Sequence, residues 1–160
     1  DKPILYLVNS NYHADHTFGN CAFPAETLVV HHRRTAEIVP HFEHEREFMI
    51  PCVDNDPKIF EGVTLRLPDI VFDDYIRFDL GGRIVECHWF GPANTPGDTM
   101  TYVPEAKAVW TGNVTGGINA FNICRHPVID QNPVVCLNAA AFEKVDIGRY
   151  SGSRDNQISI

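Results

Sequence analysis

Short apolar runs that are rich in β-branched and aromatic residues alternate with polar segments along the chain. Runs of this kind are typical of β-strands when Gly, Pro, Asn or Asp residues bound them. The pattern predicts strands over residues 4–8, 27–31, 63–67, 70–72, 75–80, 83–90 and 99–103. The Gly81-Gly82 pair between two of these runs predicts a tight hairpin.

Helical spacing replaces this pattern over residues 33–48, where Ile38, Phe42 and Phe48 recur among charged residues. Pro40 lies inside this span and has no backbone N–H, so we expect a kink or two short helices. By composition we expect a loop over 52–60, a short helical turn over 17–20 and a helix over 138–142. No repeat or linker divides the chain, so the sequence predicts one α/β domain over residues 1–160.

The most informative polar segment follows the first predicted strand and reads Asn11-Tyr12-His13-Ala14-Asp15-His16. Two imidazoles and a carboxylate lie within four residues of one another, at a strand end, where loops usually carry function. These groups are the ligands that zinc and other borderline divalent ions prefer. The segment therefore predicts a metal site formed by His13, Asp15 and His16, with three solvated loop residues as the alternative.

This segment resembles the signature loop H-x-H-x-D-H of the metallo-β-lactamase superfamily. His13, Asp15 and His16 stand at its third, fifth and sixth places, whereas Asn11 stands at the first, where the family has a metal-binding histidine. The resemblance implies an αββα sandwich of two similar halves, each of them a sheet covered by helices.

Two later segments extend the resemblance in the same order and spacing. Residues 91–98 are similar to the family segment G-x-x-H-T-x-G-D/S, with Asn94 at the place of its metal-binding histidine. Residues 107–113 are similar to a strand that ends in T-G-D, with Asn113 at the place of an aspartate that bridges two metals. Because an amide has no free nitrogen lone pair and only a modest oxygen acceptor, the sequence predicts a degenerate metal site.

The resemblance implies a metal-dependent hydrolase in which an activated water attacks an ester, lactone, thioester, lactam or phosphoester. One divalent ion, zinc by resemblance, would be held by His13, Asp15 and His16, and Asp15 would also orient the water or move a proton. The amides that replace ligands would act as hydrogen-bond donors in the site. The alternative is a metal-free relative without catalytic activity that binds a small molecule or a partner protein.

Other side chains leave alternatives open. Tyr12 either lines the pocket or packs at the strand end. His126 is the one histidine that follows Asn113 and is a further candidate ligand, with a surface loop residue as the alternative. His41 and His44 can share a helical face, which we interpret as solvated surface. The adjacent His31 and His32 point to opposite sides of a strand, which disfavours a shared ion.

The charge, the hydropathy and the cysteine content of the chain bear on its partners and its compartment. A net charge of −8 with a pI near 5.4 disfavours nonspecific binding to nucleic acid, which needs clustered Lys and Arg. No apolar run reaches the length of a membrane span. Five scattered cysteines without a C-x-x-C pair indicate reduced thiols, so we expect a cytoplasmic protein that acts on a small-molecule substrate.

The chain enters just before the signature loop, so the resemblance implies that part of the N-terminal half of the sandwich is missing. Exposed sheet edges favour association. We therefore expect a homo-oligomer or a strand-exchanged dimer, or a separate chain that supplies the strands. The segment after about residue 120 has no family pattern, and residues 148–160 are polar and irregular.

Overall fold

The computed structural model describes residues 2–114 and 157–159. Its strands are β1 (Tyr6–Val8), β2 (Leu28–His32), β3 (Ile70–Phe72), β4 (Tyr75–Asp79), β5 (Ile84–His88), β6 (Met100–Val103), β7 (Ala108–Trp110) and β8 (Gln157–Ser159). Its α-helices are α1 (Ala14–Thr17), α2 (Arg33–Ile38) and α3 (Phe42–Met49). Its 3-10 helices are η1 (Phe18–Ala22), η2 (Val39–His41), η3 (Ile50–Cys52), η4 (Pro57–Phe60) and η5 (Pro104–Ala106).

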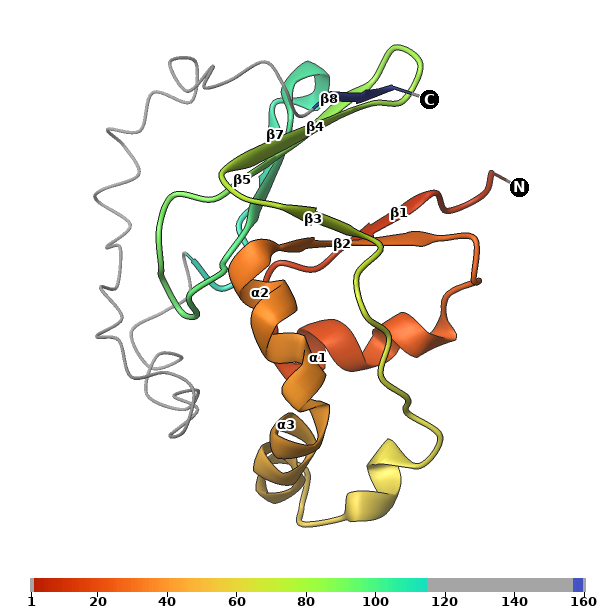
Figure 1. Cartoon of the computed structure of the whole chain (residues 1–160), viewed down its shortest axis with the longest axis vertical. Helices are drawn as coiled ribbons and strands as arrows, with labels where there is room; N and C mark the ends of the chain where they lie inside the picture. The colour runs from red at the N-terminus through yellow and green to blue at the C-terminus, as the bar shows by residue number, and fades with distance from the viewer. Residues whose placement is uncertain (1, 115–156, 160) are drawn as a thin grey trace.

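The strands form two sheets that the helices flank on one side. A parallel sheet has the order β1-β2-β3, and a five-stranded sheet has the order β7-β6-β5-β4-β8, antiparallel except for the β4–β8 pair. Figure 1 shows the α-helices on one side of the parallel sheet and the five-stranded sheet on the other. This layering confirms the predicted α/β sandwich.

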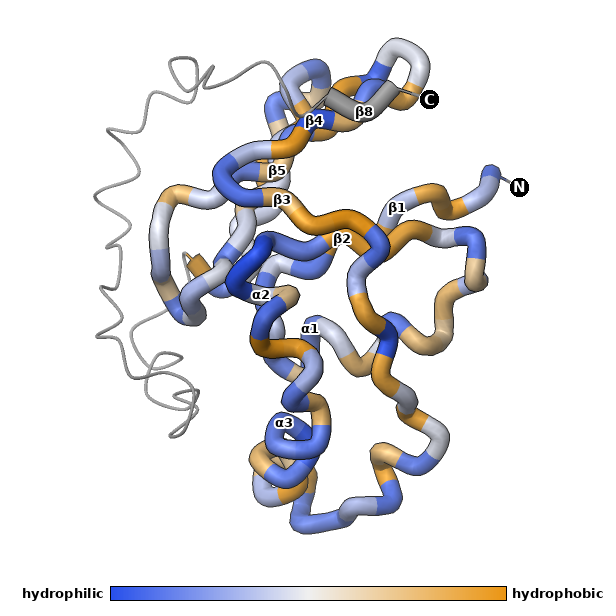
Figure 2. Tube along the Cα trace, viewed as in Figure 1, coloured by the Kyte–Doolittle hydropathy of each residue, from blue (hydrophilic) through white to orange (hydrophobic). Residues whose placement is uncertain are grey.

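The largest apolar cluster lies between the two sheets. Val30 and Phe72 from the parallel sheet pack with Ile76, Phe78 and Cys87 from the other. Ile76 and Phe78 alternate with less buried residues along β4, because successive strand residues point to opposite faces. Figure 2 shows the same concentration of hydrophobic residues along β2, β3 and β4, whereas the helices are more polar. Burial also raises the pKa of the Cys87 thiol to about 12, which leaves it an inert core residue.

Local patterning predicted the turns and the helical break correctly. Gly81 and Gly82 have φ angles of 71° and 101° and connect β4 to β5, with the Leu80 N–H donating to the Arg83 carbonyl over 2.9 Å. Pro40 lies in η2, between α2 and α3, as expected for a residue that cannot donate within a helix. In the part of the chain that the structure describes, no helix has the length and apolar character needed to cross a bilayer. Cys21, Cys52 and Cys87 are free thiols there.

Two predictions about local structure were wrong. Residues 63–67 form no strand: they belong to an irregular segment that runs to Asp69, whose carboxylate accepts from the Val29 N–H over 2.8 Å. The region 52–60 is not a plain loop either, because η3 reaches into it and η4 occupies its end. At 63–67, tertiary hydrogen bonds override the strand propensity of isolated apolar residues. Within 52–60, short 3-10 helices form that have a proline in their first turn.

Arg66 explains why the segment before β3 is irregular. Its guanidinium donates to five carbonyl oxygens of the loop that leads into β2, namely those of Asn20, Phe23, Pro24, Ala25 and Thr27. The two terminal guanidinium nitrogens make these contacts with four N–H groups, so one N–H is shared between carbonyls, whereas a lysine ammonium has three donors and no fixed geometry. Arg66 therefore ties the segment before β3 to the loop that precedes β2.

We expect Arg66→Lys to lower the free energy of unfolding by about 2 kcal/mol, because several carbonyls lose a charged donor. The measurement is urea unfolding followed by circular dichroism. Arg34→Lys is the matched control, since Arg34 makes only an exposed pair with Glu37 at 3.8 Å, and such pairs contribute little. Equal losses for the two variants would contradict the assigned role of Arg66.

Candidate functional site

The loop after β1 turns sharply into a helix. The Asn11 side-chain oxygen accepts from the His13 backbone N–H over 3.0 Å, which closes a local turn. His13 is the N-cap of α1, so the helix begins at Ala14, within the predicted signature, rather than at residue 17. Asn11, Tyr12 and His13 are all buried, and the loop is thus part of the protein interior.

A network of buried amides holds this loop against β2. Asn9 and Asn20 exchange two side-chain hydrogen bonds of 2.8 and 3.1 Å, and His31 Nε2 lies 2.6 Å from the Asn9 amide oxygen. Because an amide oxygen only accepts, Nε2 of His31 carries the proton. Burial lowers the pKa of His31 to about 4, so this imidazole is neutral and structural. The prediction that His31 is not a ligand is consistent with this geometry.

His32 is likewise structural. Its ring stacks on Trp89, with ring centroids 4.8 Å apart, and its Nδ1 accepts from the Arg34 N–H over 3.1 Å. Burial lowers the pKa of His32 to about 4, although the nearby Asp73 opposes this shift. The two adjacent histidines thus use different partners, as expected from their alternation along the strand.

His13 lies against a buried carboxylate from α3. Its Nδ1 is 3.2 Å from Glu45 Oε2, and both side chains are at least 95% buried. An ionised carboxylate only accepts, so the proton belongs on Nδ1 and the lone pair on Nε2. His13 Nε2 is itself buried and has no hydrogen-bond partner among the described residues. This pairing is the one that orients histidine ligands in metal sites, where a carboxylate holds the nitrogen that does not bind the ion.

His16 has a similar arrangement on the same short helix. Its Nδ1 lies 3.0 Å from the Ser10 hydroxyl, and its Nε2 lies 3.4 Å from Asp15 Oδ2. That Nε2 is buried and forms no hydrogen bond within the part of the chain that the structure describes. Burial lowers the pKa of His16; Asp15 opposes this effect and His13 adds to it. His16 therefore tends to be neutral and able to act as a ligand.

The loop over residues 93–99 packs against the signature loop. The Thr99 N–H donates to the Ser10 carbonyl over 2.7 Å. Gly97 is required where the same loop packs on the start of α2, since a Cβ there would lie 2.5 Å from the Thr35 hydroxyl. Asp98 is buried and accepts from the Thr95 N–H. Burial raises the pKa of Asp98 to about 6, against the lowering effect of its hydrogen bonds and of His13.

The third predicted loop reaches the same place. Gly112 has a φ of 54°, and a Cβ on it would lie 2.6 Å from Ser10 Cβ. Asn113 follows directly and is half-buried. Asn94 in the second loop is buried, and its amide nitrogen has no partner among the described residues. The three segments that carry the asparagine replacements therefore meet around Ser10.

Not every predicted site residue lies inside this region. The Asp15 side chain is 62% exposed and lies on the outer side of α1. Tyr12 packs with Ile38 and Val39 in a buried cluster, which favours the packing alternative. His41 and His44 stack at 6.0 Å and, in the part of the chain that the structure describes, belong to no group of three or more side chains that could hold a metal. His126 and the predicted helix over 138–142 lie outside the described residues.

The described residues offer candidate metal-binding nitrogens but no complete ligand set. Within residues 2–114 and 157–159, no group of three or more His, Cys, Asp or Glu side chains is placed to hold a metal. What the site does offer is two buried imidazole nitrogens, on His13 and His16, that form no hydrogen bond with the described residues. A borderline divalent ion prefers such nitrogens, and a buried polar atom without a partner is otherwise costly. The proposed trio of His13, Asp15 and His16 stays a prediction.

Sequence reasoning missed Glu45 as a site residue, and it passed over Asp98 as a part of the second segment. The signal for Glu45 was present in the helical pattern: it lies three residues after Phe42 and four before Met49, and both of these pack on the apolar face of α3. An acid on the apolar face of a helix needs a partner in the interior. Identifying that partner as His13 requires the tertiary structure.

We expect Glu45→Leu to lower the free energy of unfolding by about 2 kcal/mol, because the His13 Nδ1–H loses its buried acceptor. Glu45→Gln should restore part of the loss, since its amide oxygen can still accept. Glu43→Leu is the control, because the Glu43 side chain is 71% exposed. Denaturant unfolding provides the measurement, and a Glu45→Leu variant as stable as Glu43→Leu would contradict the pairing.

Comparisons with known proteins agree with this architecture. The sequence profile of the "Metallo-beta-lactamase superfamily" matches residues 1–131. The fold is similar to a metallo-beta-lactamase from Pontibacter korlensis (TM-score 0.56, 20% identity, covering 78% of this chain and 48% of that chain). It is also similar to the stereoselective inverting sec-alkylsulfatase Pisa1 from Pseudomonas sp. (TM-score 0.54, 19% identity, 72% and 23%). A third similar structure is metallo-beta-lactamase IND-7 (TM-score 0.52, 11% identity, 77% and 47%).

The similar structures are all longer than this chain. The chain spans about half the length of the two lactamases and about a quarter of the sulfatase. At identities of 20% or less, the likeness to these structures shows the fold and leaves the reaction to the residues of the site.

Proposed function

This chain belongs to the metallo-beta-lactamase superfamily, and on that premise we propose that it is a metal-dependent hydrolase with a reduced, single-ion site. The observation that carries the proposal is the pair of buried Nε2 atoms on His13 and His16 that form no hydrogen bond among the described residues, although Asp15 Oδ2 lies 3.4 Å from that of His16. Both belong to α1 or its N-cap, which the amide network of Asn9 and Asn20 holds in place. These two nitrogens would hold the ion, for which zinc is the choice of the family.

When bound, a divalent ion supplies a Lewis acid and lowers the pKa of a bound water. The residues of the chain perform the remaining tasks. Glu45 holds His13 in the tautomer that leaves Nε2 unprotonated. Asp15 lies beside His16 with an exposed carboxylate, where it can take a proton from water and pass it to a leaving group. The amides of Asn11 and Asn94 donate to an oxyanion that develops in the site.

We propose a small ester, lactone, thioester, lactam or phosphoester as the substrate. Each has a carbonyl or phosphoryl oxygen that gains negative charge during attack by water. Buried amide donors in the site can stabilise such charge. The free thiols at Cys21, Cys52 and Cys87 support a reducing, cytoplasm-like setting for this activity.

A second candidate function rests on a different observation. Asn11 and Asn94 stand where the family has metal ligands. The buried amide nitrogen of Asn94 has no partner among the described residues, whereas Asn11 interacts with Asp98 and lowers its pKa. The described residues also lack a three-ligand metal cluster. A metal-free relative would use these donors to bind an anionic or carbonyl-bearing small molecule without turning it over.

Metal content separates the two functions. The full chain, purified without chelator, is analysed for divalent metal and then melted with and without added zinc. The hydrolase proposal expects bound metal, a higher melting temperature with zinc, and hydrolysis of at least one chromogenic ester or lactam. His13→Ala and His16→Ala should remove the zinc response, whereas His44→Ala on exposed α3 should keep it. A protein that takes up no metal and shows no zinc shift would favour the binding function.

A further inference from the structure

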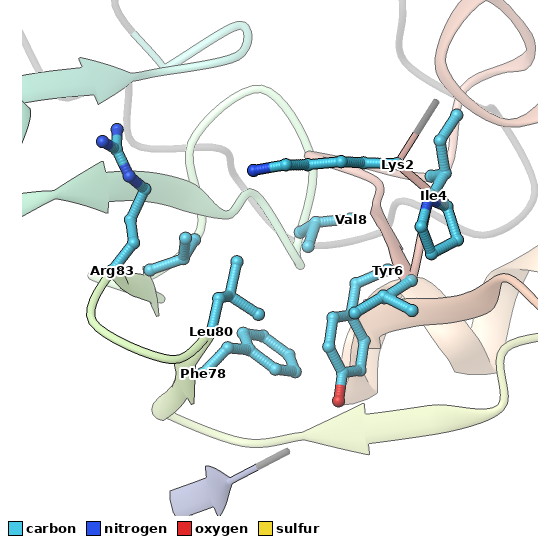
Figure 3. A pocket seen from close by; sticks show the side chains of 10 residues that line it. Lys2, Ile4, Tyr6, Val8, Phe78, Leu80 and Arg83 are labelled. Atoms are coloured by element: carbon cyan, nitrogen blue, oxygen red, sulfur yellow. The ribbon is translucent and has the colours of Figure 1, made fainter.

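An apolar cleft lies between the N-terminal segment with β1 and the β4–β5 hairpin, where it continues the space between the two sheets. It has a volume of about 540 Å³, within the range of small-molecule sites. Figure 3 shows its lining side chains, which come from the segment before β1, from β1 itself and from the β4–β5 hairpin. They are Lys2, Pro3, Ile4, Leu5, Tyr6, Val8, Phe78, Leu80, Arg83 and Val85.

The body of the cleft is hydrophobic. Tyr6 and Phe78 meet across it with ring centroids 4.4 Å apart and join it to the core between the sheets. Ile4, Leu5 and Leu80 leave 53%, 41% and 39% of their surface exposed along its rim. Contiguous exposed apolar residues around a concave surface mark a binding site.

The only charged groups among the lining residues are two cations. Lys2 and Arg83 are both exposed, and neither side chain forms a hydrogen bond or ion pair with the described residues. Figure 3 shows Lys2 extending over the cleft toward the side from which Arg83 rises. In a chain of net charge −8, the lining residues therefore present two cations and no acid to a bound negative group, although Glu105 accepts from the Ile84 N–H next to Arg83.

We propose that this cleft binds a single-chain amphipathic anion, with its hydrocarbon chain against Tyr6, Phe78 and Leu80 and its headgroup between Lys2 and Arg83. Hydrocarbon burial supplies the affinity and the cation pair supplies the orientation. The site is separate from the one around His13 and His16. Lys2 and Ser10 stand at opposite ends of β1, roughly 25 Å apart along an extended chain. The proposal does not depend on the hydrolase function.

The charge of the cleft decides against a second copy of the chain as its occupant. A symmetric dimer places the same patch on both sides of the contact. The lining residues contain two cations and no acid, so self-association would bury cations without compensation. An anionic amphiphile satisfies both the apolar surface and the charge.

The test is isothermal titration calorimetry of the full chain with laurate, below its critical micelle concentration. We expect one laurate per chain and an affinity at least tenfold weaker for Arg83→Glu, which reverses one of the two headgroup contacts. Lys58→Glu is the matched control, because it makes the same charge change at an exposed position on η4. Its affinity should stay within twofold of the parent protein. Leu80→Glu, which charges the apolar rim, should also weaken binding.

An uncharged probe separates the headgroup contact from nonspecific adsorption. Dodecanol should bind more weakly than laurate to the parent protein and equally to the parent and Arg83→Glu. Circular dichroism melting verifies that each variant is folded. The proposal is overturned if laurate does not bind, if Lys58→Glu weakens binding as much as Arg83→Glu, or if sedimentation velocity shows a dimer that laurate does not perturb and that Leu80→Glu dissociates.

Discussion

Replacing Asn11 and Asn94 with histidine and Asn113 with aspartate is expected to raise the affinity for zinc by at least about a hundredfold. The three substitutions return two imidazole lone pairs and one carboxylate to loops that already meet around Ser10. The backbone frame is in place, so added ligands need little rearrangement to reach a common ion. Calorimetry of the parent and the triple variant with zinc measures the gain.

The same substitutions should cost stability when zinc is absent. Asn11 is fully buried, and its oxygen accepts from the His13 N–H. A histidine there loses this bond and adds volume, at a cost of about 2 kcal/mol. Adding His13→Ala to the triple variant is the control, because it removes a retained donor and should abolish the gain. An unchanged zinc affinity in the triple variant would show that the three loops do not form one coordination site.

Acidification from pH 7 to pH 4 is expected to lower the free energy of unfolding by about 4 kcal/mol. The pKa of both His31 and His32 is lowered from 6.5 to about 4 by burial. Between pH 6.5 and 4, the unfolded chain therefore binds two protons that the folded chain does not bind. The free energy of unfolding decreases as the pH falls through this range. The two histidines together contribute a loss of about 7 kcal/mol.

The titration of Asp98 raises the free energy of unfolding as the pH falls over a similar pH range. Burial raises its pKa from 3.8 to about 6, so the folded state takes up this proton first and gains about 3 kcal/mol as pH falls from 6 to 3.8. The difference leaves the net loss stated above. A loss of this size is a large part of the stability of an ordinary domain.

Urea unfolding at pH 7.0, 5.5 and 4.0 measures this dependence. His31→Gln and His32→Gln should each flatten the curve, whereas the exposed His44→Gln should leave its slope unchanged. Asp98→Asn should steepen it, because the opposing contribution is removed. A stability that is independent of pH in the parent protein, or a His44→Gln variant that flattens the curve, would contradict the assignment.

Local sequence patterns predicted much of the secondary structure of this protein. Alternating and continuous apolar runs placed six of the seven strands predicted from them, and Gly81-Gly82 and Pro40 placed a hairpin and a helical break. Each of these depends on backbone conformations that one or two residues impose on their neighbours. The three loops around Asn11, Asn94 and Asn113 were also recognisable, because family motifs are local in sequence.

Long-range contacts decided the rest. Residues 63–67 have strand-forming side chains, yet no strand forms there, because the Arg66 side chain donates hydrogen bonds to backbone carbonyls about forty positions earlier. In the sequence, Glu45 is one of several acids in a charged helix. The structure shows that α3 packs it against His13, thirty-two positions away. Periodicity and composition report which face of an element is buried, but not which buried groups meet. That pairing depends on how the elements pack, and here it determines which nitrogen of His13 faces the site.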